Sequence, residues 1–226
     1  MSNWKNVFGI IWTGQLFSIL SSSIVSFALI LWLSFETGSA EVLALSALAA
    51  LLPQSVIGLV AGVYIDRWDR KRTMITADSF IAFCTLLLAV LFFLNLAEIW
   101  HIYVLLALRS VGSAFHMPAM QASIPLLAPA DQLGRIAGIN QMLESVCNIA
   151  GPALGALFIG LMDISYILLL DVGGALMACL SLLFVRIPNP EQDENKRTGI
   201  WIELKEALHI VKKIKGITPL VLFSVL

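Results

Sequence analysis

Charged residues are scarce in this sequence. Only 13% of its 226 residues are Asp, Glu, Lys or Arg, whereas a soluble domain usually has about 25%. Hydrophobic residues make up 59% of the chain, and the mean hydropathy is +0.90. They fall in long blocks and not in the short periodic stripes of a water-facing fold. The composition therefore indicates a membrane protein.

Cysteine is rare in this sequence, and catalytic motifs are lacking. Cys84, Cys147 and Cys179 have no spacing typical of a disulfide framework or a zinc site. The sequence contains no recognisable nucleophile and base pair, phosphate loop or metal-binding cluster. Its net charge of -1 lacks the basic excess of a nucleic-acid-binding protein. We therefore expect no enzyme activity, no metal or other cofactor, and no nucleic-acid partner.

Six apolar blocks are long enough to cross a bilayer, which takes about 20 helical residues. They run from Val7 to Leu33, Leu43 to Ile65, Thr73 to Leu96, Ile102 to Leu127, Ile136 to Met162 and Ser165 to Val185. None alternates polar and apolar residues as a barrel strand does, so the expected fold class is an all-α membrane protein. A seventh block begins near Thr218 and is cut off at Leu226.

Positive charges fall on one side of these blocks. All 14 Lys and Arg residues except Arg109 precede the first block, follow the sixth, or lie between the second and third or the fourth and fifth. The remaining loops carry Glu36, Glu41, Glu98, His101 and Asp163. Because Lys and Arg concentrate in cytoplasmic loops, we expect a multi-pass protein of the cell membrane with a cytoplasmic amino terminus.

The segment after the sixth block predicts how the chain divides. It opens with Ile187-Pro188-Asn189-Pro190, which resists helix formation, and a run of charges follows. Apolar residues then recur as in an amphipathic helix, which suits either the membrane surface or the ends of the spans. We expect a six-span bundle over 1–186, a cytoplasmic linker over 187–217 and the start of a seventh span over 218–226.

The loop between the second and third blocks carries the most specific pattern. It reads Gly62-Val63-Tyr64-Ile65-Asp66-Arg67-Trp68-Asp69-Arg70-Lys71-Arg72. Glycine permits close helix approach, and Asp66 is suited to cap a facing helix or to accept hydrogen bonds from the arginines. The pattern predicts a network of Gly62, Asp66, Arg67, Arg70, Lys71 and, as a second acceptor, Asp78. The alternative is that these bases only set the topology.

This loop resembles the signature of the major facilitator superfamily, which is glycine, three residues, Asp-Arg, two residues and Arg-Lys. Asp69 stands where the family usually has glycine, as in its macrolide-efflux branch. The resemblance implies two inverted three-helix repeats, a loop network that stabilises the outward-facing form, and six further spans in a partner half. This chain would then be the amino-terminal half, completed by a missing carboxy-terminal half or by a second copy.

A second element, Gly151-Pro152-Ala153-Leu154-Gly155-Ala156, resembles one found in antiporters of this family. Ala156 replaces a glycine of that element, and Cys147 replaces another upstream. Proline removes a backbone hydrogen bond and small residues allow close packing, so Gly151, Pro152 and Gly155 suit a bent helix sealed against its neighbour. The resemblance implies export, and the alternative is ordinary helix packing.

Three charged residues, Arg109, Glu144 and Asp171, are expected at depth, where an ionised group costs about 2.5 to 3.5 kcal/mol and normally pairs or lines a wet cavity. Counting about 1.5 Å per residue lets all three meet near mid-bundle. Arg109 resembles a family arginine linked to proton coupling, although Gly112 follows it one residue too early. Glu144 is the first candidate for a proton carrier and Asp171 the second, with an ion pair to Arg109 as the alternative. The other cavity candidates are Gln15, His116, Asn140 and Asn148.

The sequence thus predicts efflux of small amphipathic compounds of macrolide or multidrug type. The proton gradient would drive it without a cofactor, so the expected partners are the substrate, protons and the lipid bilayer. Two alternatives stay open. One is a facilitator for a native metabolite, and the other is a truncated chain without transport activity of its own.

Overall fold

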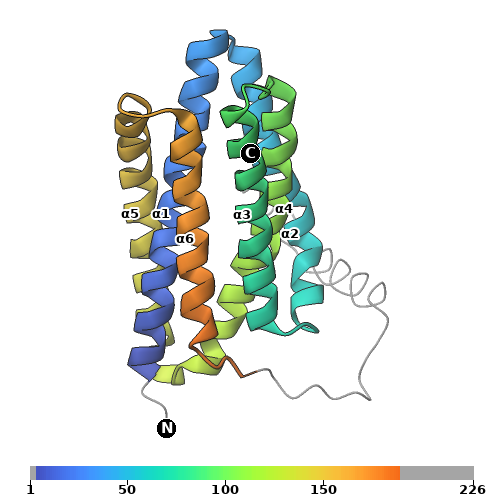
Figure 1. Cartoon of the computed structure of the whole chain (residues 1–226). Helices are drawn as coiled ribbons and strands as arrows, with labels where there is room; N and C mark the ends of the chain where they lie inside the picture. Colours follow the sequence, from blue (N-terminus) through green and yellow to red (C-terminus); the bar gives the residue numbers. More distant parts are fainter. Residues whose placement is uncertain (1–3, 189–226) are drawn as a thin grey trace. The chain divides into compact units, whose positions relative to one another are not determined.

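The computed structural model describes residues 4–188, and every long element in that range is an α-helix. The helices are Trp4–Thr37 (α1), Ala40–Ile65 (α2), Arg70–Phe93 (α3), Ile99–Leu127 (α4), Leu133–Ile159 (α5) and Ile164–Leu183 (α6), with a short 3-10 helix, Ala130–Gln132 (η1), before α5 (Figure 1). Each of the 6 long helices contains a stretch long and apolar enough to cross a membrane. The all-α fold class is therefore confirmed. The expected seventh span and all but the first two residues of the expected linker lie outside the described residues.

Local signals set the helix ends more sharply than hydropathy does. The third apolar block runs on to Leu96, but α3 ends at Phe93 because Asn95 adopts a left-handed backbone with φ of 54°. At the other end of α3, the side chain of Asp69 accepts a hydrogen bond of 2.7 Å from the Arg72 N–H. The residue that departs from the family pattern is thus the cap of α3. Asp66 was expected to cap a helix, but it lies exposed at the end of α2.

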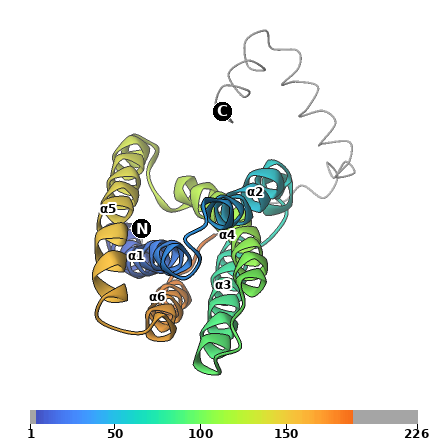
Figure 2. The same ribbon diagram turned by 90° about the horizontal axis from the view of Figure 1, so that it is seen from above.

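The helix contacts repeat between the two halves of the bundle. α1 packs mainly on α5 and α6, α4 packs mainly on α2 and α3, and α3 packs on α6. If α1, α2 and α3 are exchanged with α4, α5 and α6, in that order, the same helix pairs are in contact. Because each set has three helices, α4 crosses in the direction opposite to α1, so the two repeats are inverted. Seen from above, α2 and α5 lie on opposite sides of the bundle (Figure 2).

Two apolar clusters fill the core at different heights. One joins the second half of α1, the second half of α3 and the first parts of α4 and α6, with Leu29, Leu88, Ile102 and Leu168 fully buried. The other lies toward the opposite end and includes Ile11, Ile65, Met74, Ala119 and Leu182. The segments of α1, α3, α4 and α6 between the two clusters are the ones that carry polar side chains.

Glycine and serine bring α1 close to both of its neighbours. An added Cβ would clash with a facing serine at Gly14, Gly151 and Gly174, whose partners are Ser181, Ser23 and Ser21. At Gly155 it would lie 2.9 Å from the backbone carbonyl oxygen of Ile24. Small residues thus let α5 pack closely against α1, as close helix packing requires. These residues are Gly151 and Gly155, and Pro152 lies between them in the same helix.

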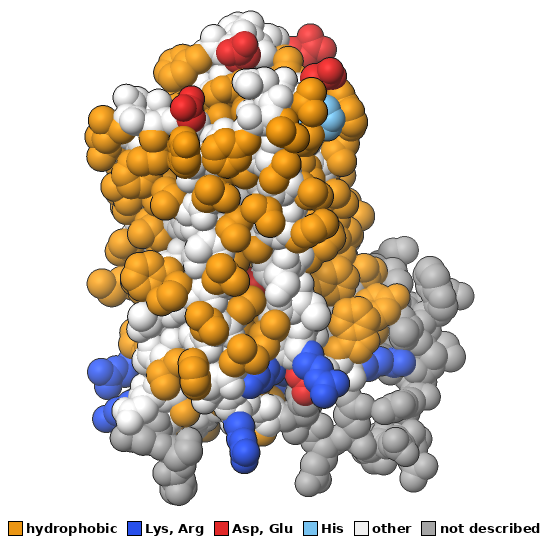
Figure 3. Space-filling view, in the orientation of Figure 1, with side chains coloured by type: hydrophobic (Ala, Val, Ile, Leu, Met, Phe, Trp, Pro, Cys, Tyr) orange, Lys and Arg blue, Asp and Glu red, His pale blue; other side chains and the backbone are white. Residues whose placement is uncertain are grey.

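Charged side chains separate the two ends of the bundle. On the face shown in Figure 3, Lys and Arg gather at the end where α1 begins, and Asp and Glu gather mainly at the opposite end. The basic residues belong to the beginning of α1, the loops between α2 and α3 and between α4 and α5, and the segment after α6. We call these the basic end and the acidic end.

The contact at Gly155 can be tested by adding one methyl group. Gly155→Ala should destabilise the chain by about 1 to 3 kcal/mol, because the backbone of Ile24 cannot yield as a side chain can. Thermal unfolding in detergent measures the change. Gly138→Ala is the matched control, since it lies in the same helix with nothing within 4 Å of an added Cβ, and should be neutral or stabilising by up to about 1 kcal/mol. Equal effects of the two substitutions would contradict the close packing.

Candidate functional site

The first of two buried polar layers is built around an ion pair. The guanidinium of Arg109 on α4 donates to Oδ2 of Asp171 on α6 and to the hydroxyl of Thr85 on α3. Thr85 also donates to Asp171 at 2.8 Å, and the hydroxyl of Ser22 on α1 donates to the other carboxylate oxygen. Arg109 is 7% exposed and Asp171 1% exposed. The four central helices therefore meet at one charged pair. We call this set the Arg109 layer.

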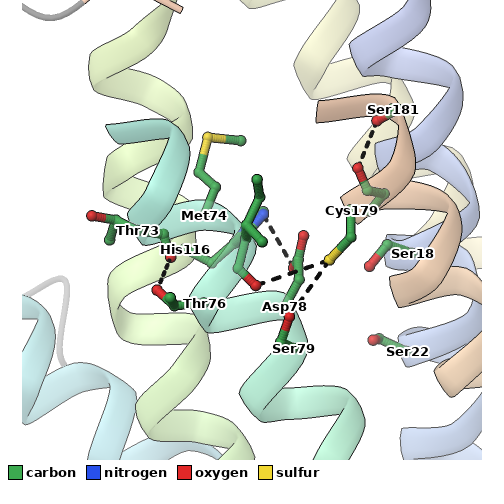
Figure 4. A network of polar contacts seen from close by, with 12 residues as sticks. Ser18, Ser22, Thr73, Met74, Thr76, Asp78, Ser79, His116, Cys179 and Ser181 are labelled. Carbon is green, nitrogen blue, oxygen red and sulfur yellow. Dashed lines mark hydrogen bonds and ion pairs between the residues drawn. The ribbon is translucent and has the colours of Figure 1, made fainter. Parts of the chain in front are cut away.

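The second layer lies nearer the basic end and consists of Gln15, Asp78 and His116. His116 Nε2 on α4 lies 3.3 Å from Asp78 Oδ1 on α3, and both side chains are buried (Figure 4). Cys179 on α6 lies alongside and contacts the hydroxyl of Ser79 at 3.8 Å. Asp78 was expected to accept hydrogen bonds from the loop arginines, but its neighbour in the structure is His116. We call this set the His116 layer.

On three of the four central helices, the polar residues of the two layers are separated by the same number of residues. The polar residues are seven apart on three helices: Gln15 and Ser22 on α1, Asp78 and Thr85 on α3, Arg109 and His116 on α4. Seven residues make about two helical turns and about 10 Å of rise, and they return to the same face. Because α3 and α4 run in opposite directions, Thr85 opposite Arg109 puts Asp78 opposite His116. The residue seven after Asp171 on α6 is Ala178, which is buried and apolar.

A hollow of about 270 Å³ opens beside the His116 layer, between α1, α4 and α5. Its polar lining includes Gln15, His116, Asn140 and Glu144, and its apolar lining includes Met117 and Met120. The indole of Trp12 donates a hydrogen bond of 2.7 Å to the side-chain oxygen of Asn140. The hollow thus combines an apolar wall with a few polar groups, as small-molecule sites commonly do.

The three charges expected to meet at mid-bundle do not all meet. Arg109 pairs with Asp171, whereas Glu144 is half-buried and lines the hollow. The expected ion pair with Arg109 is therefore made by Asp171, and the side chain of Glu144 stays accessible from the hollow. Counting residues gives the depth of a charged residue in the bundle. The rotation of α5 about its own axis decides which residues lie next to Glu144.

Of the cavity candidates expected on α5, the structure places only some at the hollow. Asn140 and Glu144 line the hollow, and Gly151 and Gly155 are buried against α1, but Asn148 is exposed and outside the hollow lining. Cys147 takes its place on the buried face. Its backbone carbonyl accepts a hydrogen bond of 3.1 Å from the hydroxyl of Ser23.

At the basic end of the bundle, the start of α3 is joined to the end of α6. The ammonium of Lys71 donates hydrogen bonds of 3.2 and 2.7 Å to the carbonyl oxygens of Leu183 and Val185, at the end of α6. A cation there also suits the negative end of the helix dipole. Arg70 is buried at the start of α3, and Arg67 is partly exposed. Gly62 is exposed, and no described atom lies within 4 Å of an added Cβ, so the close approach expected there is not made within the described residues.

Sequence reasoning missed three residues of these sites. Thr85 touches both members of the ion pair, Trp12 binds Asn140, and Trp68 of the loop stacks on Phe115 of α4 with ring centroids 5.9 Å apart. One signal was present for Thr85, because it lies seven residues after Asp78 in an otherwise apolar run. The indole contacts left no comparable pattern.

Six apolar helices in two inverted repeats, a buried ion pair at their centre and a hollow with polar groups are features typical of membrane transport proteins. The model of the Major Facilitator Superfamily matches residues 11–226, and the chain belongs to this family. Its members are transporters and not enzymes, and the chain is accordingly a multi-pass membrane protein.

Curated relatives place it near one branch of that family. Macrolide efflux protein A of Streptococcus pyogenes is 37% identical over 226 residues, which are 100% of this chain and 56% of that protein. Macrolide efflux protein A of Enterococcus faecalis is 37% identical over 190 residues, covering 84% of this chain and 58% of that protein. The uncharacterized MFS-type transporter YfiS of Bacillus subtilis is 28% identical over 178 residues, or 77% of this chain and 40% of that protein. The chain spans about half the length of the macrolide efflux proteins it matches.

The ion pair predicts an asymmetry between single and double substitutions. Removing one partner, as in Arg109→Leu or Asp171→Leu, leaves the other charge buried and should destabilise the chain by about 3 to 5 kcal/mol. The double variant leaves no charge behind and should be more stable than either single variant. Thermal unfolding of the four proteins in detergent measures the difference. A double variant as unstable as the sum of the two single changes would show that the pair is not coupled.

Proposed function

We propose that this chain forms the amino-terminal half of a transporter that exports small amphipathic compounds. The observation that carries the proposal is the 37% identity to Macrolide efflux protein A of Streptococcus pyogenes over the whole chain. The hollow between α1, α4 and α5 supports it, because its methionine and indole surfaces suit an apolar body and its amide and carboxylate groups suit a polar head. The antiporter-like residues Gly151, Pro152 and Gly155 favour export over import.

Transport requires a second half in this proposal. The chain spans about half the length of its macrolide-efflux relatives, and α4 makes only slight contact with α5. Large apolar side chains are exposed along α2 and α5, among them Leu51, Val56, Met142 and Ile149. A carboxy-terminal half or a second copy of the chain would cover part of this surface, and lipid would cover the rest.

We infer that protons drive export and that no cofactor takes part. Glu144 is the preferred carrier because its half-buried carboxylate lines the hollow, where it can exchange a proton with water. Asp171 is less suited, since Arg109, Thr85 and Ser22 already occupy its two carboxylate oxygens, away from the hollow. The Arg109 layer then serves to hold the four central helices in place around the hollow.

We also propose that the α2–α3 loop biases the transporter toward its outward-facing form. Lys71 fastens the start of α3 to the end of α6, and Asp69 caps α3. Asp66 and Gly62 remain accessible for contact with the second half, while Arg67 and Arg70 flank them in the loop. The basic end would face the cytoplasm, as the concentration of Lys and Arg there favours.

Export can be measured as macrolide accumulation in cells that lack their own drug pumps. The chain should be expressed alone and joined to the remaining part of the Streptococcus pyogenes relative. We expect the joined protein to lower accumulation and an uncoupler to abolish the effect. Activity of the short chain alone would mean that two copies assemble. Unchanged accumulation with both proteins in the membrane would refute macrolide export.

In the same assay, Glu144→Gln should abolish uncoupler-sensitive export without reducing the amount of protein in the membrane. The matched control is Glu41→Gln, which changes an exposed carboxylate at the acidic end and should leave export intact. Normal proton-driven export by Glu144→Gln would exclude Glu144 as the carrier.

Orientation can be tested with two matched cysteine substitutions at exposed aspartates. Asp163→Cys lies at the acidic end and Asp131→Cys at the basic end. An impermeant maleimide added to intact cells should label only Asp163→Cys, and both should react after the membrane is opened. The unsubstituted chain gives the background from the native cysteines. Labelling of Asp131→Cys alone in intact cells would reverse the orientation.

A further inference from the structure

The His116 layer differs from the Arg109 layer in the pairing of its polar atoms. Among the described residues, the buried atoms Gln15 Nε2, Asp78 Oδ2 and His116 Nε2 have no hydrogen-bond partner. Gln15 and Asp78 are each 3% exposed and His116 is 7% exposed. His116 Nε2 keeps its 3.3 Å contact with Asp78 Oδ1, whereas Gln15 Nε2 and Asp78 Oδ2 have no such contact. Buried polar groups are almost always paired, so this layer is suited to bind a small ligand such as water or a proton. Gln15 and His116 also line the hollow, which gives such a ligand a route.

The charges of the layer indicate what the ligand is. Asp78 and His116 lie 3.3 Å apart, and with one proton between them they are either an ion pair or two neutral groups. Without that proton, a single negative charge is left buried, which a low-dielectric interior strongly disfavours. A pair that holds one proton between its two groups avoids this buried charge.

Neighbouring helices offer no other cation to this carboxylate. On α3 the nearest bases along the chain are Arg72, which is exposed, and Lys71, which binds carbonyl oxygens at the end of α6. On α4 the nearest base is Arg109, which is bound to Asp171. α1 presents Gln15 and Ser18, α6 presents Cys179, and α5 presents Glu144 across the hollow. α2 has no charged residue between Glu41 and Asp66. Among residues 4–188, a proton is thus the positive charge best placed to neutralise this carboxylate.

We propose that Asp78 and His116 together bind one proton, which reaches them through the hollow. The proton lies either on the carboxyl group of Asp78, beside a neutral imidazole, or on the imidazole of His116, beside an ionised carboxylate. Its arrival or departure changes the charge of the pair by one. Gln15 borders the same water-accessible space and completes the layer. This site is separate from Glu144, and it goes beyond the proposed function because it concerns protonation of the pair and not the export of a compound.

The bound proton has a structural consequence. While it is present, the pair is neutral overall and joins α3 to α4 at the height of the hollow. When it leaves, the remaining negative charge must be solvated, which favours water in the hollow. Protonation of Asp78 and His116 therefore couples the hydration of the hollow to the contact between α3 and α4.

The proton can be observed directly in the full chain reconstituted in lipid nanodiscs. Nitrogen NMR of labelled histidine shows whether the His116 ring carries one or two protons, and the signal is identified by its loss in His116→Gln. Infrared spectroscopy shows whether Asp78 is a carboxylic acid, by a band lost in Asp78→Asn. At neutral pH we expect one of the two signatures, an imidazolium at His116 or a protonated carboxyl at Asp78.

Two variants make the result decisive. If the proton lies on the ring, Asp78→Asn should convert His116 to the neutral form, and Asp131→Asn, which changes an exposed carboxylate, should not. If it lies on Asp78, His116→Gln should eliminate or shift the acid band. A neutral His116 together with no band lost in Asp78→Asn would overturn the proposal. Both spectra are independent of drug export, so a failure of macrolide efflux leaves this test intact.

Discussion

The bilayer interior requires that every buried charge be paired within the protein, and the ion pair of Arg109 and Asp171 satisfies this requirement at the centre of the bundle. Through Thr85 and Ser22 the same pair reaches α3 and α1, so one charge on α4 orders four helices. α2 and α5 take no part in it and lie at the sides of the bundle. The chain thus separates a fixed centre from two outer helices, which carry exposed apolar surface and of which α5 also lines the hollow.

Close packing and polar pairing have different roles in this arrangement. α1 is held by glycine and serine contacts on both sides, where an added methyl group would meet backbone or a short side chain. α4 and α5 make only slight contact with each other, and the hollow lies along their junction with α1. The proposed substrate site and Glu144 therefore lie where α4 and α5 pack loosely, beside helices whose packing is tight.

Long apolar blocks were sufficient to predict the six helices, because a span is set by length and hydropathy. Depth was also predictable, since counting residues placed Arg109 and Asp171 at one height. Partners were harder to predict. The neighbour of Asp78 is His116, Glu144 faces the hollow, and Asn148 faces outward. These choices depend on the rotation of each helix about its axis, which tertiary packing sets and a single sequence does not encode in its periodicity. The capping role also fell on Asp69 and not Asp66, because the start of α3 was placed by loop geometry that hydropathy does not detect.

The equal spacing of the two polar layers has a mechanical meaning. A single contact between antiparallel helices allows them to pivot, whereas two contacts about two turns apart fix both their sliding and their tilt. Thr85 faces Arg109 and Asp78 faces His116, so these two contacts hold α3 and α4 together as one rigid unit. As long as both contacts hold, a rearrangement that exposes the hollow alternately to the two sides must move α3 and α4 together and bend the bundle elsewhere.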